Sequence, residues 1–208
     1  MNTVIYKSIE FFIIFNLIPI SFALSYSPWI KLAIGCIGFF YIIYVLLKVE
    51  KEKFKIAKNL NWKLFFCQTL IKFLGIVCVT TLFVWFTNKD VLFNVLLNKS
   101  KLWFFILFFY SVFSVYPQEL IYRTFYFKRY HNLLLNKNLF IFINAIVFSL
   151  GHIFFKNLLV LVLTFLGGLL FACTYNKTKS TLLVSIEHAV YGCWLFTVGM
   201  GEMLGFPA

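Results

Sequence analysis

Charged side chains are scarce in this sequence. They make up 12% of its 208 residues, whereas an average soluble domain carries about 25%. Hydrophobic residues make up 62%, which is more apolar surface than one water-soluble core of this length can hide. The low charge excludes an ordinary soluble domain and predicts that the lipid bilayer is the solvent of the chain.

Cysteine pairs and zinc motifs are missing as well. The cysteines stand singly in apolar segments, without a CxxC pair, and no HExxH motif occurs. These patterns predict neither disulfides nor a cofactor, and we expect the thiols to be small buried hydrophobic groups. They are Cys36, Cys67, Cys78, Cys173 and Cys193.

Acidic residues are few, and the net charge is therefore +12. The Lys and Arg residues sit in short loops between apolar runs, and no basic stripe accompanies a soluble domain. The positions of these basic residues therefore indicate how the chain is oriented in the membrane. They exclude nucleic acid as a partner. With the N-terminus in the cytoplasm, 13 basic residues lie on the inner side and 5 on the outer side. We expect a bacterial inner (cytoplasmic) membrane protein with lipids as partners and a cytoplasmic N-terminus.

Apolar runs divide the chain into membrane spans. Each is about 17–25 residues long, the length that a helix needs to cross roughly 30 Å of hydrocarbon. A turn is expected at Ser27-Pro28, because proline disfavours helix in the residue before it. The prediction is an all-α transmembrane bundle of about seven (7–8) helices, forming a single membrane domain over 1–208, with room for a partial helix in 89–101. The predicted spans are 8–27, 29–47, 64–87, 102–122, 139–155, 157–175 and 181–200.

Ionisable side chains inside spans are costly, and they usually mark function or a specific partner. Glu10 and Lys72, in the first half, are expected to be structural. Glu187 precedes His188 but faces another direction. The residues that favour chemistry are concentrated in the second half: Gln118, Glu119, Arg123, His152 and His188.

Glu119 and Arg123 lie four residues apart, so on a helix they share one face. The polar stretch 130–138 is typical of the turn of a helical hairpin. Two antiparallel helices joined there place Glu119 and His152 at about the same depth, roughly 25 Å from the turn. A carboxylate and an imidazole at one level are suited to holding and deprotonating a water molecule.

Three motifs then resemble one known family, the CAAX protease and bacteriocin-processing (CPBP, or Abi) intramembrane endopeptidases. That family carries Glu-Glu-x-x-x-Arg, Phe-x-x-x-His and His-x-x-x-Asn on successive helices. The resemblance covers about 102–195, which we expect to be the catalytic core. The matching segments are Gln118-Glu119-Leu120-Ile121-Tyr122-Arg123, Phe148-Ser149-Leu150-Gly151-His152 and His188-Ala189-Val190-Tyr191-Gly192.

The resemblance implies cleavage of a peptide or lipidated protein terminus without a covalent intermediate. By this resemblance, Glu119 and His152 prepare the water, Arg123 orients the carboxylate, and His188 donates to the oxyanion. Phe148 is expected to be a wall of the cavity, although plain packing explains it equally well. The expected cavity opens toward the cytoplasmic side.

The chain departs from the family pattern at two positions. Gln118 replaces the first glutamate, and glutamine does not accept a proton at neutral pH. Gly192 replaces the asparagine, and losing one oxyanion donor typically costs about 10²–10³ in rate. Tyr191, a backbone amide or another nearby side chain is a possible substitute donor. The departures leave open a degenerate member that acts as an immunity, scaffold or peptide-binding factor.

Two further alternatives remain. A small proton-coupled transporter is disfavoured, because no inverted repeat is evident, and Gly167-Gly168 fits a close helix–helix contact better than a broken transport helix. A single zinc ion held by Glu119, His152 and His188 is a variant of the hydrolase hypothesis. Sensitivity to chelators separates that variant from metal-independent hydrolysis.

Overall fold

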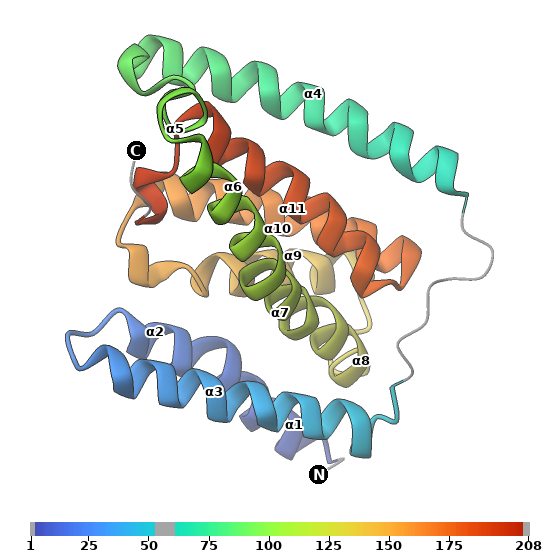
Figure 1. Ribbon diagram of the computed structural model, residues 1–208. Helices are drawn as coiled ribbons and strands as arrows, with labels where there is room; N and C mark the ends of the chain where they lie inside the picture. Colours follow the sequence, from blue (N-terminus) through green and yellow to red (C-terminus); the bar gives the residue numbers. More distant parts are fainter. Residues whose placement is uncertain (1–2, 53–60, 206–208) are drawn as a thin grey trace. The chain divides into compact units, whose positions relative to one another are not determined.

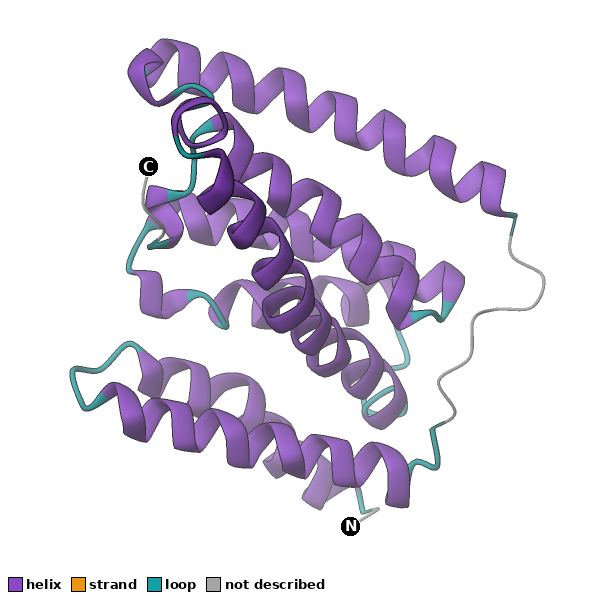
Figure 2. Ribbon diagram, viewed as in Figure 1, coloured by secondary structure: helices purple, strands orange, loops and turns teal. Residues whose placement is uncertain are grey.

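The computed structural model describes residues 3–52 and 61–205, and these residues form helices without any strand (Figure 2). Among these described residues, seven helical runs are long and apolar enough to cross a membrane, which confirms the predicted number of spans and makes the chain an integral membrane protein. The runs are Val4–Phe22, Pro28–Val49, Trp62–Thr87, Ser100–Arg129, Lys137–Phe155, Leu158–Thr178 and Thr181–Val198.

The chain forms two compact units, residues 1–55 with 118–181 and residues 56–117 with 182–208. In the first unit, the elements along the chain are α1 (Val4–Phe12), η1 (Ile13–Leu17), α2 (Ile18–Phe22), α3 (Pro28–Tyr44), η2 (Val45–Val49), η5 (Leu120–Phe125), α8 (Tyr126–Arg129), α9 (Lys137–Leu150), η6 (Ile153–Phe155) and α10 (Leu158–Thr178) (Figure 1).

The second unit contains α4 (Trp62–Thr87), η3 (Lys89–Val91), α5 (Asn94–Asn98), α6 (Ser100–Phe109), η4 (Tyr110–Val115), most of α11 (Thr181–Val198) and η7 (Glu202–Leu204). The short α7 (Tyr116–Glu119) contains the boundary between the units. Elements η3 and α5 are the partial helix expected in 89–101.

Every span differs from the prediction by a few residues at one end or both, and the first and the fourth differ most; the first ends at Phe22 rather than residue 27. The first begins at Val4 rather than residue 8, because the Thr3 side chain caps α1 by accepting from the Tyr6 N–H. The fourth continues past the predicted end at 122 to Arg129. Arg123 and Arg129 do not end the helix, because both are fully buried and paired with carboxylates. The Ser27-Pro28 turn is confirmed, since α3 begins at Pro28.

The cysteines also differ from the prediction. Cys36, Cys67, Cys78 and Cys173 are exposed on their helices, and Cys193 is half-buried. In a membrane protein an apolar side chain need not enter the protein interior, because lipid is an equally apolar surrounding. Hydropathy therefore did not distinguish lipid-facing thiols from buried ones.

Helices α9 and α10 form the main packing contact of the first unit. Gly168 allows the close approach: a Cβ built there would lie 3.0 Å from Ala145 Cα and 3.2 Å from the Phe148 ring. Gly167 lies instead under the ring of Phe171, on its own helix. The close helix contact predicted for the glycine pair is therefore made by Gly168.

Gly168→Leu is expected to lower the free energy of unfolding by about 1–3 kcal/mol, because the new side chain overpacks a contact of backbone against backbone. The measurement is denaturant unfolding in detergent micelles. Gly35→Leu is the control, since its Cβ would meet no described atom within 4 Å. An equal loss in both variants would show that α9 and α10 have room to separate.

A buried cluster of charges joins α1, the end of η2 and α8 in the same unit. Arg129 Nε donates to Glu10 Oε2 at 2.7 Å, and Arg129 Nη1 donates to Glu50 Oε1 at 2.8 Å. Tyr130 donates to Glu10 Oε2 at 3.0 Å. Burial and the Glu10 carboxylate raise the pKa of Tyr130, so its hydroxyl stays protonated and remains a donor. The structural role predicted for Glu10 is thus that of a buried counter-ion.

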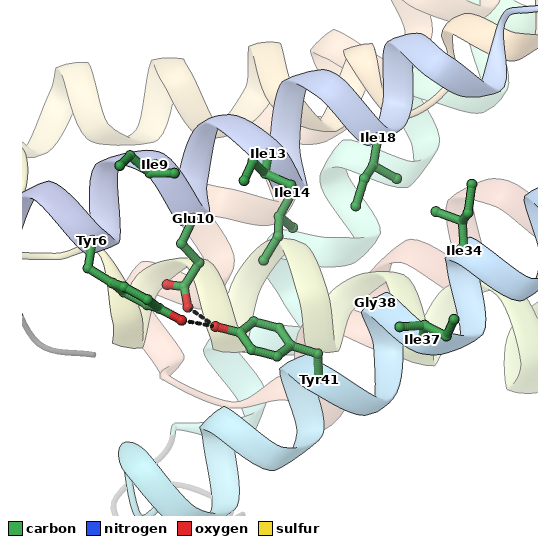
Figure 3. Close-up of a pocket in the computed structure, with 10 residues that line it drawn as sticks. All are labelled: Tyr6, Ile9, Glu10, Ile13, Ile14, Ile18, Ile34, Ile37, Gly38 and Tyr41. Carbon is green, nitrogen blue, oxygen red and sulfur yellow. Dashed lines mark hydrogen bonds between the residues drawn. The ribbon is translucent and has the colours of Figure 1, made fainter.

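A cavity of about 450 Å³ lies next to this cluster, between α1–α2 and α3 (Figure 3). Its walls are mostly isoleucine side chains, and its polar end holds Glu10, Tyr6 and Tyr41. The Tyr41 hydroxyl donates to Glu10 and lies 3.0 Å from the Tyr6 hydroxyl. The polar groups at this end belong to the hydrogen-bond network of Arg129.

Candidate active site

The first motif lies on η5 and the residues just before it, in a distorted part of the helical run Ser100–Arg129. The π-helical turns η4 and η5 lie on either side of α7, which ends at Glu119. Pro117 contributes to the distortion, because it has no N–H to donate to the preceding turn. Such π-helical turns are frequent at functional sites.

Glu119 and Arg123 form a buried ion pair one turn apart. Arg123 Nε lies 3.3 Å from Glu119 Oε2, and both side chains are fully buried. Arg123 Nη1 also donates to Asn144 Oδ1 at 2.7 Å, and Asn144 Nδ2 donates to the Tyr122 carbonyl oxygen at 2.7 Å. Asn144 therefore fixes the guanidinium that orients the carboxylate.

The second motif packs on the first through aromatic contacts. The Arg123 guanidinium lies 4.6 Å from the Phe148 ring centroid, and the Tyr122 ring meets Phe148 edge-on at 5.2 Å. Phe148 thus packs directly against Arg123 and Tyr122. In these contacts and in the Arg123–Asn144 bond, the two partners lie at similar distances along the chain from the turn 130–136. The predicted antiparallel hairpin requires this pairing.

His152 does not lie on a regular helix, because α9 ends at Leu150 and η6 begins at Ile153. Its Nδ1 lies 2.8 Å from the Phe148 carbonyl oxygen, which only accepts hydrogen bonds. The Nδ1 atom must therefore carry a proton, and in a neutral imidazole the basic lone pair is on Nε2. This arrangement suits a general base.

Gly151 precedes His152 and lies directly against Tyr122. A Cβ built on Gly151 would overlap the Tyr122 hydroxyl group. The absence of a side chain at 151 lets the turn that carries His152 approach η5. Glu119, Arg123, Phe148 and His152 all lie in the first unit, and Gln118, beside Glu119, is half-buried.

The third motif lies on α11 in the second unit. His188 is 6% exposed, and its Nε2 lies 3.1 Å from the Tyr110 hydroxyl of η4. Glu187, on another face of α11, is fully buried and binds Lys72 Nζ at 2.7 Å. The structural role of Lys72 is therefore an ion pair with Glu187, and Glu187 faces a different direction from His188, as expected.

Tyr191 is held on the Glu187 side of α11. Its hydroxyl donates to Glu187 Oε1 at 2.9 Å and lies 3.2 Å from the Thr69 carbonyl oxygen. A Cβ on Gly192, by contrast, would overlap the ring and the hydroxyl of Tyr110. Position 192 therefore faces Tyr110, whereas Tyr191 supports the ion pair with Lys72.

Sequence reasoning missed Asn144, Tyr122 and Tyr110. Asn144 had a usable signal, because it is a polar residue in an apolar span, four residues before Phe148 and eight before His152. The two tyrosines had none, since tyrosine is common throughout this chain. Within neither unit do three or more His, Cys, Asp or Glu side chains of the described residues gather as metal ligands do.

Comparisons with known proteins agree with the motifs. The family model described as "Rce1-like: Type II CAAX prenyl endopeptidase Rce1-like" matches residues 99–194. No curated protein and no solved structure matches the chain significantly. The matched residues contain all three motifs and nearly coincide with the core predicted at 102–195. Residues 99–194 are thus similar to the Rce1-like family of CAAX prenyl endopeptidases, in agreement with the resemblance of the three motifs.

Proposed function

We propose that this membrane protein is an active endopeptidase that cleaves a peptide or a lipidated protein terminus by direct attack of water. The observation that carries the proposal is the buried Glu119–Arg123 pair, packed through Phe148 on the helix that leads to His152. A buried carboxylate that is oriented by a guanidinium, which is itself held by an amide, is suited to catalysis.

In the proposed reaction, Glu119 and His152 bind and deprotonate the water. His152 Nε2 is the basic nitrogen, since Nδ1 donates to the Phe148 carbonyl. Arg123 orients Glu119, and Asn144 holds Arg123 in place. The attacking hydroxide adds to the carbonyl carbon of the scissile peptide, and the proton passes to the leaving amine.

The role of His188 follows the third motif of the family. We assign it to stabilisation of the oxyanion that forms when water adds to the carbonyl. The proposal also includes a single membrane domain. The cytoplasmic N-terminus and a site that opens to the cytoplasm complete it, and this orientation rests on the distribution of Lys and Arg.

The test compares the protein termini of membrane fractions from cells that express wild-type protein, His152→Ala or His131→Ala at equal levels. We expect new termini with wild type that fall by about 10²–10⁴-fold with His152→Ala, the range for loss of a general base. His131→Ala is the matched control, because His131 is an exposed histidine in the turn between α8 and α9. It is expected to cut like wild type.

Identical termini in all three strains and in a strain without the protein would contradict the proposal. If a phenotype of the wild-type protein then survived in His152→Ala, a binding or immunity role would replace the hydrolase. The cut sites, if they appear, identify the substrate class directly, including whether a lipidated terminus is required.

A further inference from the structure

The space beside Gly192 is filled by a residue from another helix. A side chain at 192 would overlap the Tyr110 ring and its hydroxyl, so Tyr110 lies where the side chain of residue 192 would begin. Both residues belong to the second unit. Tyr110 can therefore occupy its observed position only if residue 192 is glycine. The replacement of the family's asparagine by Gly192 thus depends on the presence of Tyr110.

Tyr110 is held firmly in this place. Its ring packs edge-on against Phe196 at 4.9 Å and stands at 82° to the His188 ring, with 6.0 Å between centroids. Phe196 and His188 are both buried. The hydroxyl lies 3.1 Å from His188 Nε2, within hydrogen-bond distance.

A residue that only filled the space over Gly192 would need no hydroxyl. Phenylalanine, the commonest aromatic residue of this chain with 29 copies, would pack there equally well. The Tyr110 hydroxyl instead lies within hydrogen-bond distance of His188, the histidine of the third motif, which this chain retains. Tyr191, the other nearby candidate, is committed to Glu187 and the Thr69 carbonyl.

We propose that Tyr110 is the catalytic residue that replaces the missing asparagine of the third motif. His188 Nε2–H donates to Tyr110 Oη, and the Tyr110 O–H donates to the developing oxyanion of the scissile peptide. The imidazole thus polarises the hydroxyl and acts on the oxyanion through it. This inference rests on the proposed peptidase function and names the donor that completes its site.

The first test is Tyr110→Phe, which keeps the ring and removes only the donor. The readout is the rate at which the wild-type-dependent termini accumulate, together with the melting temperature in detergent. We expect the rate to fall about 10²–10³-fold, as for loss of one oxyanion donor, with little change in melting temperature. Tyr116→Phe is the control, because Tyr116 is 42% exposed on the same helical run, and it is expected to keep the wild-type rate.

The second test exchanges the two positions. Gly192→Asn alone is expected to be inactive, because its Cβ overlaps Tyr110. Tyr110→Ala with Gly192→Asn restores the family's amide and vacates the space that it needs. We expect the double variant to cut at least tenfold faster than Tyr110→Ala alone.

A third readout needs no substrate. The chain has three histidines, so the ¹⁵N signals of His188 are assignable by substituting the other two. We expect Tyr110→Phe to shift the Nε2 signal of His188 and to leave those of His131 and His152 unchanged. An unchanged Nε2 signal would show that the hydrogen bond does not form.

The outcomes separate the two proposals. If wild type cuts, His152→Ala does not, and Tyr110→Phe cuts at the wild-type rate, the peptidase function stands and the role of Tyr110 is overturned. If wild type produces no new termini, the peptidase function fails, and the catalytic role of Tyr110 fails with it.

Discussion

Glu119→Gln is expected to reduce cleavage by about 10²–10⁴-fold, the contribution of a positioned general base. Gln118 stands where the family has its first glutamate, so Glu119 is the only carboxylate of the first motif. An amide binds water but does not take its proton. The measurement is the rate of appearance of the wild-type-dependent termini in membranes or proteoliposomes.

Loss of fold must be separated from loss of the base, because Glu119→Gln leaves the Arg123 guanidinium fully buried without its carboxylate. Removing one partner of such a pair typically costs about 3–5 kcal/mol, whereas removing both is often close to neutral. Glu119→Leu with Arg123→Met is therefore expected to be more stable than Glu119→Gln and equally inactive. Substantial cleavage by this double variant would refute the role of Glu119.

An exchange of the two neighbours identifies which position acts. Gln118→Glu with Glu119→Gln keeps the composition and moves the carboxylate by one residue, which turns it about 100° around the helix. Glu119 is fully buried against Arg123, while Gln118 is half-buried. We expect the exchanged variant to remain inactive. Wild-type activity in it would assign the base to position 118, as in the family pattern.

The fold was largely predictable because a bilayer imposes a length on each helix. A run of about 20 apolar residues identifies a span almost independently of its partners, and all seven spans were found in this way. The hairpin around 130–136 followed from the same regular geometry, since two antiparallel helices fix which residues are level. The ends of spans were less predictable, because Arg123 and Arg129 look like loop residues until their buried carboxylate partners are known.

The supporting contacts of the site lay beyond sequence reasoning. Lys72 and Glu187 pair across 115 positions of the chain, and no periodicity encodes a contact between helices so far apart. The same holds for Tyr110 and Gly192. The sequence shows only that Gly192 replaces the family's asparagine. It does not show that the Tyr110 ring occupies the space that a side chain at 192 would need.

Arg129→Met is expected to lower the free energy of unfolding by about 3–5 kcal/mol, the usual result of breaking a buried ion pair from one side. Arg129 is fully buried and donates to both Glu10 and Glu50. Without it, Glu10 keeps only the tyrosine hydroxyls of Tyr41 and Tyr130 among these partners. Denaturant unfolding in detergent micelles measures the loss.

Lys128→Met is a closely matched control, because it removes the same charge from the adjacent residue. Lys128 pairs with Glu52 at 2.8 Å, but its side chain is 46% exposed, and exposed pairs contribute about 0–1 kcal/mol. Arg129→Met with Glu10→Leu should recover part of the stability, since no buried carboxylate is then left on α1. If Arg129→Met proved as mild as Lys128→Met, water must reach Glu10, and the cluster would then be a hydrated surface rather than the buried link between α1, η2 and α8.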